Sequence, residues 1–480
     1  MLYEAVIGLE VHVQVRTASK MFCACPNRFG AEPNTLTCPV CLGYPGTLPV
    51  INREAVRKTL AAGIMCGCEI PARSKFDRKH YFYPDMPKNY QISQYDLPFC
   101  TAGRIPISGK GFSGQALPEK TIGITRIHLE EDVGKLNHFG AYSGVDFNRA
   151  GVPLMEIVSE PDLRSADEAY AYLTSLKQIL QYAEIGDCDM EKGQMRCDVN
   201  VSVRPAGEAQ FGTKIEIKNL NSFRAVHRSL VHEIARQVAA VEDGQVLRQE
   251  TRRWDDAAGA TFLMRTKEHA HDYRYFPEPD LMPVEIGADY VAEIGAALPE
   301  IPYRRQERFV REYGITPYDA HVLILEKALA DYYEAAASES DNPKAVANWV
   351  ITDLLRVLGE RGLTIAACPI RPADLARLVA LVLGGKITAK VAKDTVFPAM
   401  LETGESPEGI VRAQGLEQVN DDAAIEGFVK QAIAAHPTVV EQYKSGKATA
   451  LQFLVGQVMK LSRGKANPQV VLALLRKQLD

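Results

Sequence analysis

The chain has 480 residues, of which 46% are hydrophobic and 24% are charged, as in ordinary globular proteins. This composition excludes a disordered chain, a collagen-like fibre and a small scaffold held together by disulfides. The formal net charge of −5 also excludes a uniformly basic nucleic-acid-binding protein, although a local basic patch is compatible with it. At about 150 residues per domain, the length predicts about three domains.

The N-terminal sequence and the ten cysteines bear on the compartment. Residues 1–15 lack the cationic start and the unbroken apolar run of a signal peptide. A run of about 18 apolar residues, which a membrane-spanning helix needs, occurs nowhere in the sequence. We therefore predict a cytoplasmic protein that does not enter a membrane and whose cysteines stay reduced.

The first strand is predicted at Val6–Val15, where apolar and polar side chains alternate. Side chains two residues apart point to the same side of a strand, so Glu10 and His12 are neighbours. Two later segments, His128–Asp132 and Leu154–Val158, offer further carboxylates. Carboxylates with one imidazole suit a hard cation such as Mg²⁺ that carries nucleotide phosphates. The alternative is a solvated polar face on which His12 is simply hydrogen-bonded.

Four early cysteines form two short pairs, which are separated by twelve residues. The pairs are Cys23-x-Cys25 and Cys38-x-x-Cys41. Four thiolates in two close pairs suit a tetrahedral Zn²⁺ ion, so we predict a structural zinc knuckle. Two alternatives stay open: buried thiols without a metal, and a nucleophilic Cys41, for which no paired histidine is evident nearby.

Two helices and two further strands are predicted between residues 165 and 241. The helices cover about 165–183, after the cap candidate Ser165, and about 221–241, after Asn221 or Ser222. The strands, Arg196–Arg204 and Lys214–Lys218, each carry charged and polar side chains on one face. Such a face could hold the phosphate and ribose of a nucleotide, or it could be a well-paired exposed sheet surface. The candidate nucleotide-binding residues here are Arg196, Asp198, Asn200, Ser202, Lys214 and Lys218.

Two segments, residues 76–85 and 272–280, combine cationic and aromatic side chains. Stacking together with positive charge suits nucleotides or the ends of nucleic acids, and the alternative is a pair of proline-rich loops packed by tyrosines. The sequence contains neither GxxxxGK[ST] nor GxGxxG opening a βαβ unit. A P-loop enzyme is therefore excluded, and a Rossmann dinucleotide site is unsupported.

From about residue 294 the pattern becomes helical. Helices are predicted at Pro343–Glu360 and at Pro372–Leu383, and a linker is predicted at Thr403–Gly409. From Lys430 to the C-terminus, eight basic and two acidic residues give a charge of +6, so the remainder carries −11. A basic helical tail suits the RNA backbone, and the alternative is a solvated helical bundle. The candidate RNA contacts are Lys447, Lys460, Arg463 and Lys465.

Several long runs, spread over nearly the whole chain, resemble one known family. The runs are residues 6–12, 75–79, 81–85, 130–132, 157–162, 218–222, 272–280 and 453–457. In these runs the chain is similar to the B subunit of the bacterial and archaeal glutamyl/aspartyl-tRNA amidotransferase. The resemblance implies an α+β fold in which a mixed-sheet cradle domain, residues 1–293, carries a kinase-like ATP site. It also implies an all-α helical domain, residues 294–405, and a small all-α YqeY-like tail, residues 406–480, that binds tRNA.

The resemblance also assigns roles to individual residues. It implies that Glu10, His12, Glu131 and Glu156 occupy the Mg²⁺ positions. It further implies that the chain is one of the members that carry the zinc knuckle. Lys79 and Lys88 are hypothetical contacts to phosphate or to an ammonia channel.

The activity that the resemblance implies is the ATP-dependent amidation of Glu-tRNA(Gln), Asp-tRNA(Asn) or both. Ammonia does not attack a carboxylate, so the γ-phosphoryl group of ATP first converts the side chain into an acyl phosphate. The expected partners are an amidase, the A subunit, which delivers the ammonia, and the small C subunit. Two alternatives remain: a zinc-dependent hydrolase, for which an HExxH motif is missing, and a non-catalytic RNA-binding scaffold.

Overall fold

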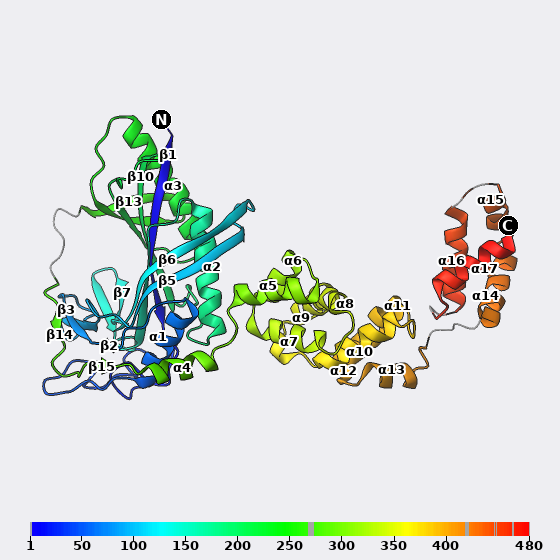
Figure 1. The fold of residues 1–480 in the computed structure, drawn as a ribbon, viewed down its shortest axis with the longest axis horizontal. Coiled ribbons are helices and arrows are strands. Elements are labelled where there is room, and N and C mark those ends of the chain that lie inside the picture. The colour runs from blue at the N-terminus through cyan, green and yellow to red at the C-terminus, as the bar shows by residue number, and fades with distance from the viewer. Residues whose placement is uncertain are drawn as a thin grey trace. The chain divides into compact units, whose positions relative to one another are not determined.

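An eight-stranded sheet organises the N-terminal part of the chain (Figure 1). The strand order is β13-β12-β11-β10-β1-β9-β6-β5, and only the β11–β12 pair is parallel. The strands are β1 (Tyr3–Gln14), β5 (Cys100–Lys110), β6 (Ala116–Glu131), β9 (Pro153–Ser159), β10 (Met195–Pro205), β11 (Ile215–Lys218), β12 (Glu250–Asp255) and β13 (Ala260–Thr266). This mixed sheet, followed by an all-helical C-terminal region, confirms the predicted α+β class.

The computed structural model describes residues 2–266, 273–417, 422–445, 447, 449–462 and 465–479. Two compact units divide the chain at residues 303 and 304. Among the described helices, none is both long and apolar enough to cross a membrane.

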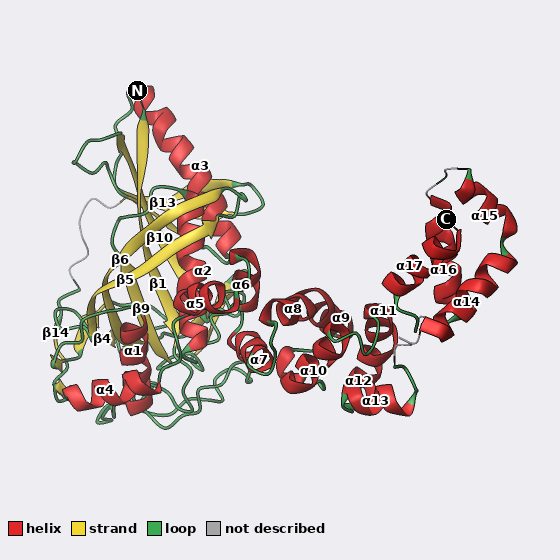
Figure 2. Cartoon of the chain, turned by 45° about the vertical axis from the view of Figure 1, so that its right-hand side comes forward, coloured by secondary structure: helices red, strands yellow, loops and turns green. Residues whose placement is uncertain are grey.

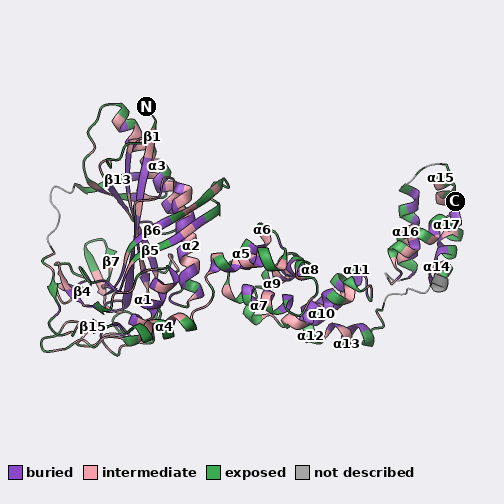
Figure 3. Cartoon of the chain, viewed as in Figure 1, coloured by how far each residue is buried: buried purple, intermediate pink, exposed green. Residues whose placement is uncertain are grey.

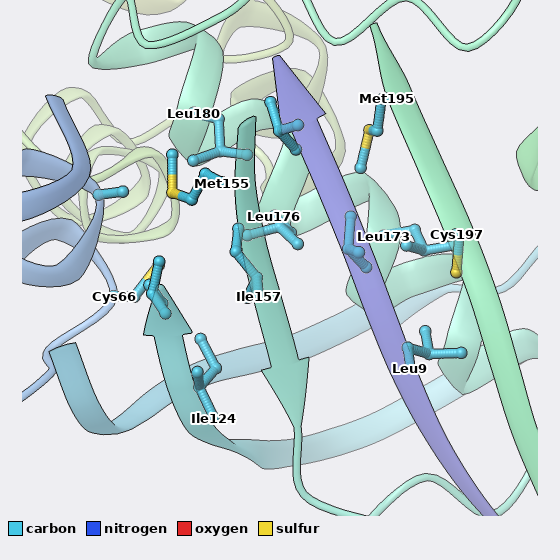
Figure 4. Packing of buried hydrophobic residues seen from close by; sticks show 14 of the residues in the cluster. Leu9, Cys66, Ile124, Met155, Ile157, Leu173, Leu176, Leu180, Met195 and Cys197 are labelled. Atoms are coloured by element: carbon cyan, nitrogen blue, oxygen red, sulfur yellow. The ribbon is translucent and has the colours of Figure 1, made fainter. Parts of the chain in front are cut away.

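One face of the large sheet is apolar and is covered by helices (Figure 2). Figure 4 shows Leu173, Leu176 and Leu180 of α2 beside Leu9 of β1 and Ile157 of β9. All five side chains are buried, and their removal from water stabilises this layer by roughly 25 cal/mol per Å² of apolar surface. The central strands are therefore mostly buried (Figure 3). The polar side chains that alternate with the apolar side chains along these strands lie on the opposite face of the sheet.

The predicted elements of the first unit form with small shifts at their ends. Ser165 caps α2 by accepting a hydrogen bond from the backbone N–H of Glu168, and Ser222 caps α3. Both caps confirm the predicted helix starts. The helices of this unit are α1 (Arg53–Met65), α2 (Ala166–Tyr182), α3 (Phe223–Glu242) and α4 (Ala288–Ala297). The minor strands are β2 (Arg73–Ser74), β3 (Asp77–His80), β4 (Tyr90–Ser93), β7 (Lys135–Phe139), β8 (Tyr142–Asp146), β14 (Phe276–Pro277) and β15 (Val284–Glu285).

The described part of the second unit is helical and contains two separate hydrophobic clusters. The first cluster draws on α5 (Pro302–Tyr313), α6 (Pro317–Leu323), α7 (Lys327–Ala337), α8 (Pro343–Asn348), α9 (Leu355–Arg361), α10 (Pro372–Leu383), α11 (Ala389–Val391), α12 (Phe397–Thr403) and α13 (Pro407–Ala413). The second cluster draws on α14 (Asp422–Ala435), α15 (Pro437–Lys444), α16 (Thr449–Leu461) and α17 (Pro468–Leu479).

Two predicted features of this unit need correction. The helix expected at Pro343–Glu360 is interrupted by a π-helical segment, Trp349–Leu354, in which Thr352 donates a 2.6 Å hydrogen bond to the carbonyl of Asn348. The linker expected at Thr403–Gly409 already contains the start of α13, which Ser406 caps. Because Ile410 and Val411 of α13 pack into the first helical cluster, α13 belongs to that cluster.

Candidate functional site

Three neighbouring strands bring acidic and imidazole side chains together on the polar face of the sheet. His12 on β1 lies opposite Glu156 on β9, and Glu156 lies opposite His128 on β6. Glu130 follows His128 by two residues and therefore lies on the same face. The register alone thus collects four chemically active side chains in one patch.

The distances show that these side chains meet. The Nε2 atom of His12 lies 3.4 Å from Oε2 of Glu156 and 3.9 Å from Oε1 of Glu130. The Nε2 atom of His128 lies 3.2 Å from Glu156 and 3.5 Å from Glu130. Ser93 donates a 2.9 Å hydrogen bond that fixes the Glu130 carboxylate. One ligand atom each from His12, Glu130 and Glu156 lies within 4.8 Å of the others, as a shared metal ion requires.

The electrostatics of this patch favour cations. Burial alone lowers the pKa of the His128 imidazole, but the charges of Glu156 and Glu130 raise it to about 9. Burial also lowers the pKa of the His12 imidazole, but the hydrogen bond to Glu156 and the charge of Glu156 outweigh burial and raise this pKa. Burial raises the pKa of the Glu156 carboxyl, but the two imidazoles hold it well below its ordinary value. The carboxylates therefore stay ionised and attract positive charge.

The structure places Glu131 away from this patch. Consecutive residues of a strand point to opposite faces, so Glu130 faces His12 whereas Glu131 faces the other side of the sheet. There the Glu131 carboxylate pairs with Lys88 and accepts a 3.0 Å hydrogen bond from the backbone N–H of Ile92. Lys88 is thus engaged by Glu131. Lys79 instead faces the patch, and after burial the charge of Glu130 is the main influence on its pKa, which is raised.

Glu10 lies beside His12 on β1 but groups with a second set of carboxylates. It lies opposite Asp198 on β10 and accepts a 2.8 Å hydrogen bond from Asn200. Glu10, Asp198 and Glu216 offer ligand atoms within 4.8 Å of one another. The ammonium of Lys218 pairs with Asp198 and lies 3.1 Å from Glu216, so a lysine already balances part of this charge.

The remaining candidate nucleotide contacts fall into two places. Ser202 and Lys214 line a pocket of about 270 Å³ together with Glu10, Asn200 and the exposed ring of Phe211. Arg196 lies elsewhere and donates a 3.2 Å hydrogen bond to Asp132. The pocket therefore gathers Glu10 and three of the six predicted nucleotide contacts.

The four knuckle cysteines converge as their spacing predicts. Their sulfur atoms all lie within 4.8 Å of one another. The backbone N–H of Cys38 donates a 3.1 Å hydrogen bond to Sγ of Cys41. A hydrogen bond from the Cys23 thiol lowers the pKa of Cys41 to about 5. Four close sulfurs, one of them readily ionised, form a donor set that fits a tetrahedral metal ion. The residues therefore form a candidate metal site.

The candidate RNA contacts lie in the helical tail. Lys447 and Lys460 are exposed, and Lys465 is half-buried. Arg463 lies outside the described residues, as does Asp272 of the second aromatic segment.

His128 and Glu130 lie in the predicted acidic segment His128–Asp132, although the resemblance singled out Glu131 within it. Glu216, on the predicted strand Lys214–Lys218, was not among the predicted site residues. The alternation of β6 places His128 and Glu130 on one face. Glu131 continues the other face, which carries the apolar residues Ile127 and Leu129. This pattern could have separated Glu130 from Glu131.

Comparisons with known proteins identify the family of this chain. A family model described as the GatB/GatE catalytic domain matches residues 5–292, and one described as the GatB domain matches residues 331–479. Residues 5–292 therefore belong to the GatB/GatE class of catalytic domains.

Full-length relatives narrow this class. A protein of Carboxydothermus hydrogenoformans is 55% identical over 482 residues, which cover 99% of each chain. Proteins of Thermoanaerobacter pseudethanolicus and Persephonella marina are each 52% identical over 100% of both chains. All three are named as the B subunit of an aspartyl/glutamyl-tRNA(Asn/Gln) amidotransferase. The chain therefore belongs to the GatB family of amidotransferase subunits.

Proposed function

We propose that this chain is the component of a tRNA-dependent amidotransferase that activates the carboxylate of the misacylated amino acid. The substrate class is Glu-tRNA(Gln), Asp-tRNA(Asn) or both, as the names of the relatives state. The observation that carries the proposal is the cluster of His12, Glu130 and Glu156 on the polar face of the sheet. Two carboxylates and an imidazole that face one point are suited to phosphoryl transfer.

His12, Glu130 and Glu156 would hold Mg²⁺, because carboxylate oxygens are its preferred protein ligands and these three residues converge. The bound ion would supply neutralisation of the phosphate charge. Glu10 is the adjacent carboxylate on the same strand face, and its bond to Asn200 keeps it pointing toward the neighbouring pocket. Glu131 takes no part in this proposed ligand set.

The nucleotide is proposed to bind in the pocket next to this cluster. Lys214 supplies a cation there, while Asn200 and Ser202 supply hydrogen-bonding groups for ribose or phosphate. The exposed ring of Phe211 offers a face for the adenine base. Lys79, whose pKa is raised by the charges of Glu130 and Glu156, would contact the transferred phosphoryl group.

Chemically, a side-chain carboxylate oxygen of the amino acid attacks the γ-phosphorus, and the bond to ADP breaks. The lone pair of ammonia then attacks the carbonyl carbon, phosphate leaves with the bonding electrons, and a proton is released. Ammonia comes from the glutaminase reaction of the partner amidase, and the small third protein completes the heterotrimer. Water must be kept from the acyl phosphate, so reaction within the assembled complex is part of the proposal.

The zinc knuckle, the compartment and the domain division complete the proposal. The four cysteines would hold a structural Zn²⁺, since four thiolates leave no open position for substrate. We propose a cytoplasmic complex in which residues 1–293 catalyse, residues 294–405 connect and residues 406–480 bind tRNA. The proposed boundary after residue 293 falls within α4. The proposed boundary after residue 405 precedes α13, which packs with the first helical cluster.

Reconstitution tests the proposed activity. The purified chain, together with the amidase and the small third protein, is supplied with misacylated tRNA, ATP and ammonium. Amidated tRNA should form together with ADP and phosphate, and all three products should disappear when ATP is withheld. Amide turnover without ATP or tRNA would point to a hydrolase instead. Binding of tRNA with no ATP-dependent product would point to a scaffold.

A further inference from the structure

Lys20 is a fully buried lysine beside the cysteine knuckle. Its side chain has 0% exposed surface. The ammonium lies 3.7 Å from Sγ of Cys41 and 3.4 Å from the carbonyl oxygen of Phe147. Among the described residues, no carboxylate lies within 4.0 Å of it. A buried charge without a counter-charge is strongly unfavourable, so the position of Lys20 calls for a source of negative charge.

The knuckle can provide that charge. A divalent ion held by four thiolates carries two net negative charges, and Cys41 is the thiolate that Lys20 contacts. The other hydrogen-bond acceptor of the ammonium, within the part of the chain that the structure describes, is a neutral backbone carbonyl. Lys20 therefore offsets one of the two net negative charges of the metal-bound site, and in the metal-free site the Cys41 thiolate is the group that faces Lys20.

The local backbone holds Lys20 at this position. The backbone N–H of Lys20 donates a 2.9 Å hydrogen bond to the carbonyl of Cys25, inside the knuckle. Gly151, at φ +83°, packs against the lysine stem, and a Cβ there would lie 3.5 Å from Cδ of Lys20 and 3.3 Å from Cβ of Cys41. The chain thus leaves space for one extended side chain directed at the sulfurs.

We propose that Lys20 is the buried counter-cation of the knuckle metal centre and that it sets the affinity of the four cysteines for Zn²⁺. The inference rests on the proposed zinc knuckle. Lys20 is a positioning residue: it is not a ligand, but it neutralises one of the two charges and donates a hydrogen bond to the Cys41 thiolate. A group that donates a hydrogen bond to a metal ligand tunes the site without touching the ion.

Zinc affinity tests this role directly. Full-length wild-type protein and the variants Lys20→Met and Lys20→Gln are loaded with Zn²⁺, and metal release to a competing chelator is followed with a colorimetric dye. Because a hydrogen bond to a charged group is lost, both variants should bind zinc about tenfold to a hundredfold more weakly. If Lys20→Met does not fold, Lys20→Gln decides, because its amide can still donate to the Phe147 carbonyl.

The melting temperature provides a second test, because Lys20→Met should change it differently in the zinc-loaded and the zinc-stripped protein. In the zinc-loaded protein Lys20→Met should lower the melting temperature, whereas in the zinc-stripped protein it should leave it unchanged or raise it. Lys58→Met is the matched control, because Lys58 is also buried and donates its hydrogen bond to the carbonyl of Glu184, away from the cysteines. It should alter stability equally with and without zinc.

The possible results distinguish a failure of the role of Lys20 from a failure of the proposed zinc knuckle. Equal zinc affinity in the wild type and in both Lys20 variants would overturn the role of Lys20 while leaving the zinc knuckle intact. Failure of the wild type to retain Zn²⁺ against the chelator would overturn the knuckle itself.

Discussion

At the scale of single residues, the candidate site is defined by which way each side chain points. His12 and His128 both face Glu130 and Glu156, and that contact raises the pKa of each imidazole, so a metal ion that binds His12 competes with a proton there. The carboxylates stay ionised and present negative charge toward one point. A cation or a phosphate-bound cation is the ligand that such a point accepts most readily.

Lys79 is predicted to stabilise the transferred phosphoryl group. In the reconstituted complex, Lys79→Met should lower kcat on the order of 10²-fold, because a cation aimed at developing phosphate charge is lost. The Kd for tRNA should change little. Lys110→Met is the control, since Lys110 is exposed on β5. Initial-rate measurements over a range of ATP concentrations separate kcat from KM, and an unchanged kcat would show that Lys79 has no such role.

Glu233 is predicted to link the stability of the cradle to pH. Burial raises the pKa of this carboxyl, but hydrogen bonds from Arg236 and Thr261 hold it below its ordinary value. A lowered folded pKa contributes stability above the unfolded pKa of about 4.3, and this contribution is lost as the pH falls through the folded value.

The Glu233→Gln variant should therefore unfold about 1–3 kcal/mol more easily at pH 7, and the difference should shrink as the pH falls from about 5, near the unfolded pKa, through the lower folded pKa. Urea unfolding followed by the fluorescence of Trp254, in a Trp349→Phe background, measures it, because the chain has only two tryptophans. A difference that stays constant over this pH range would contradict the assignment.

The sequence predicted which side chains come together where their spacing along the chain alone decides the geometry. The four cysteines converge as their spacing indicates. The partners of Glu130 and Glu131 depend instead on contacts between distant segments, because Ser93 binds the first carboxylate and the backbone of Ile92 binds the second. The alternation of side chains can assign each glutamate to a face of the sheet, but it cannot predict which residues contact that glutamate.

At the scale of elements, capping residues define where the helices of the cradle begin. Ser165→Ala removes the acceptor for the Glu168 N–H, 3.1 Å away. We expect a loss of about 1 kcal/mol in the free energy of unfolding, whereas Ser165→Asp should retain most of the stability because aspartate also caps helices well. The same Trp254 fluorescence measurement applies, and equal losses in both variants would contradict the capping role.

Alternation and caps predicted β1, β10, α2, α3 and α10 closely, since these features are local. The π-helical segment at Trp349–Leu354 was not predictable in this way. Lys393, from another segment, pairs with Asp353 at 2.8 Å and lies over the Trp349 ring, so tertiary contacts help to shape the segment. The start of α13 was missed because Gly404 and Gly409 suggested a loop, although Ser406 and Pro407 form a helix start.

At the scale of the whole molecule, the charge is divided unevenly along the chain. Deleting residues 418–480, rather than cutting at 406, leaves the core of the first helical cluster intact, because α13 belongs to it. The truncated protein, in complex, should bind tRNA more weakly and with a shallower dependence of log K on log salt concentration. Fluorescence anisotropy across a salt titration measures both, and an unchanged slope would contradict tRNA binding by the tail.

The order of strands in the large sheet is not predictable from local sequence patterns. The neighbours of β1 are β9 and β10, which follow it by more than a hundred residues, and no local pattern specifies such pairings. The patch of His12, Glu130 and Glu156 exists only because β1, β9 and β6 lie side by side. Sequence therefore indicated the chemical groups, and the topology determined which of them meet.

The central claim is that Glu130, with His12 and Glu156, activates the carboxylate of the substrate. Single-turnover formation of ADP in the reconstituted complex, dependent on misacylated tRNA, tests it most directly. Glu130→Gln should slow ADP formation on the order of 10²-fold with unchanged tRNA affinity. Glu119→Gln, an exposed glutamate on the same strand, should have no effect. ADP formation by Glu130→Gln at the wild-type rate would contradict the account.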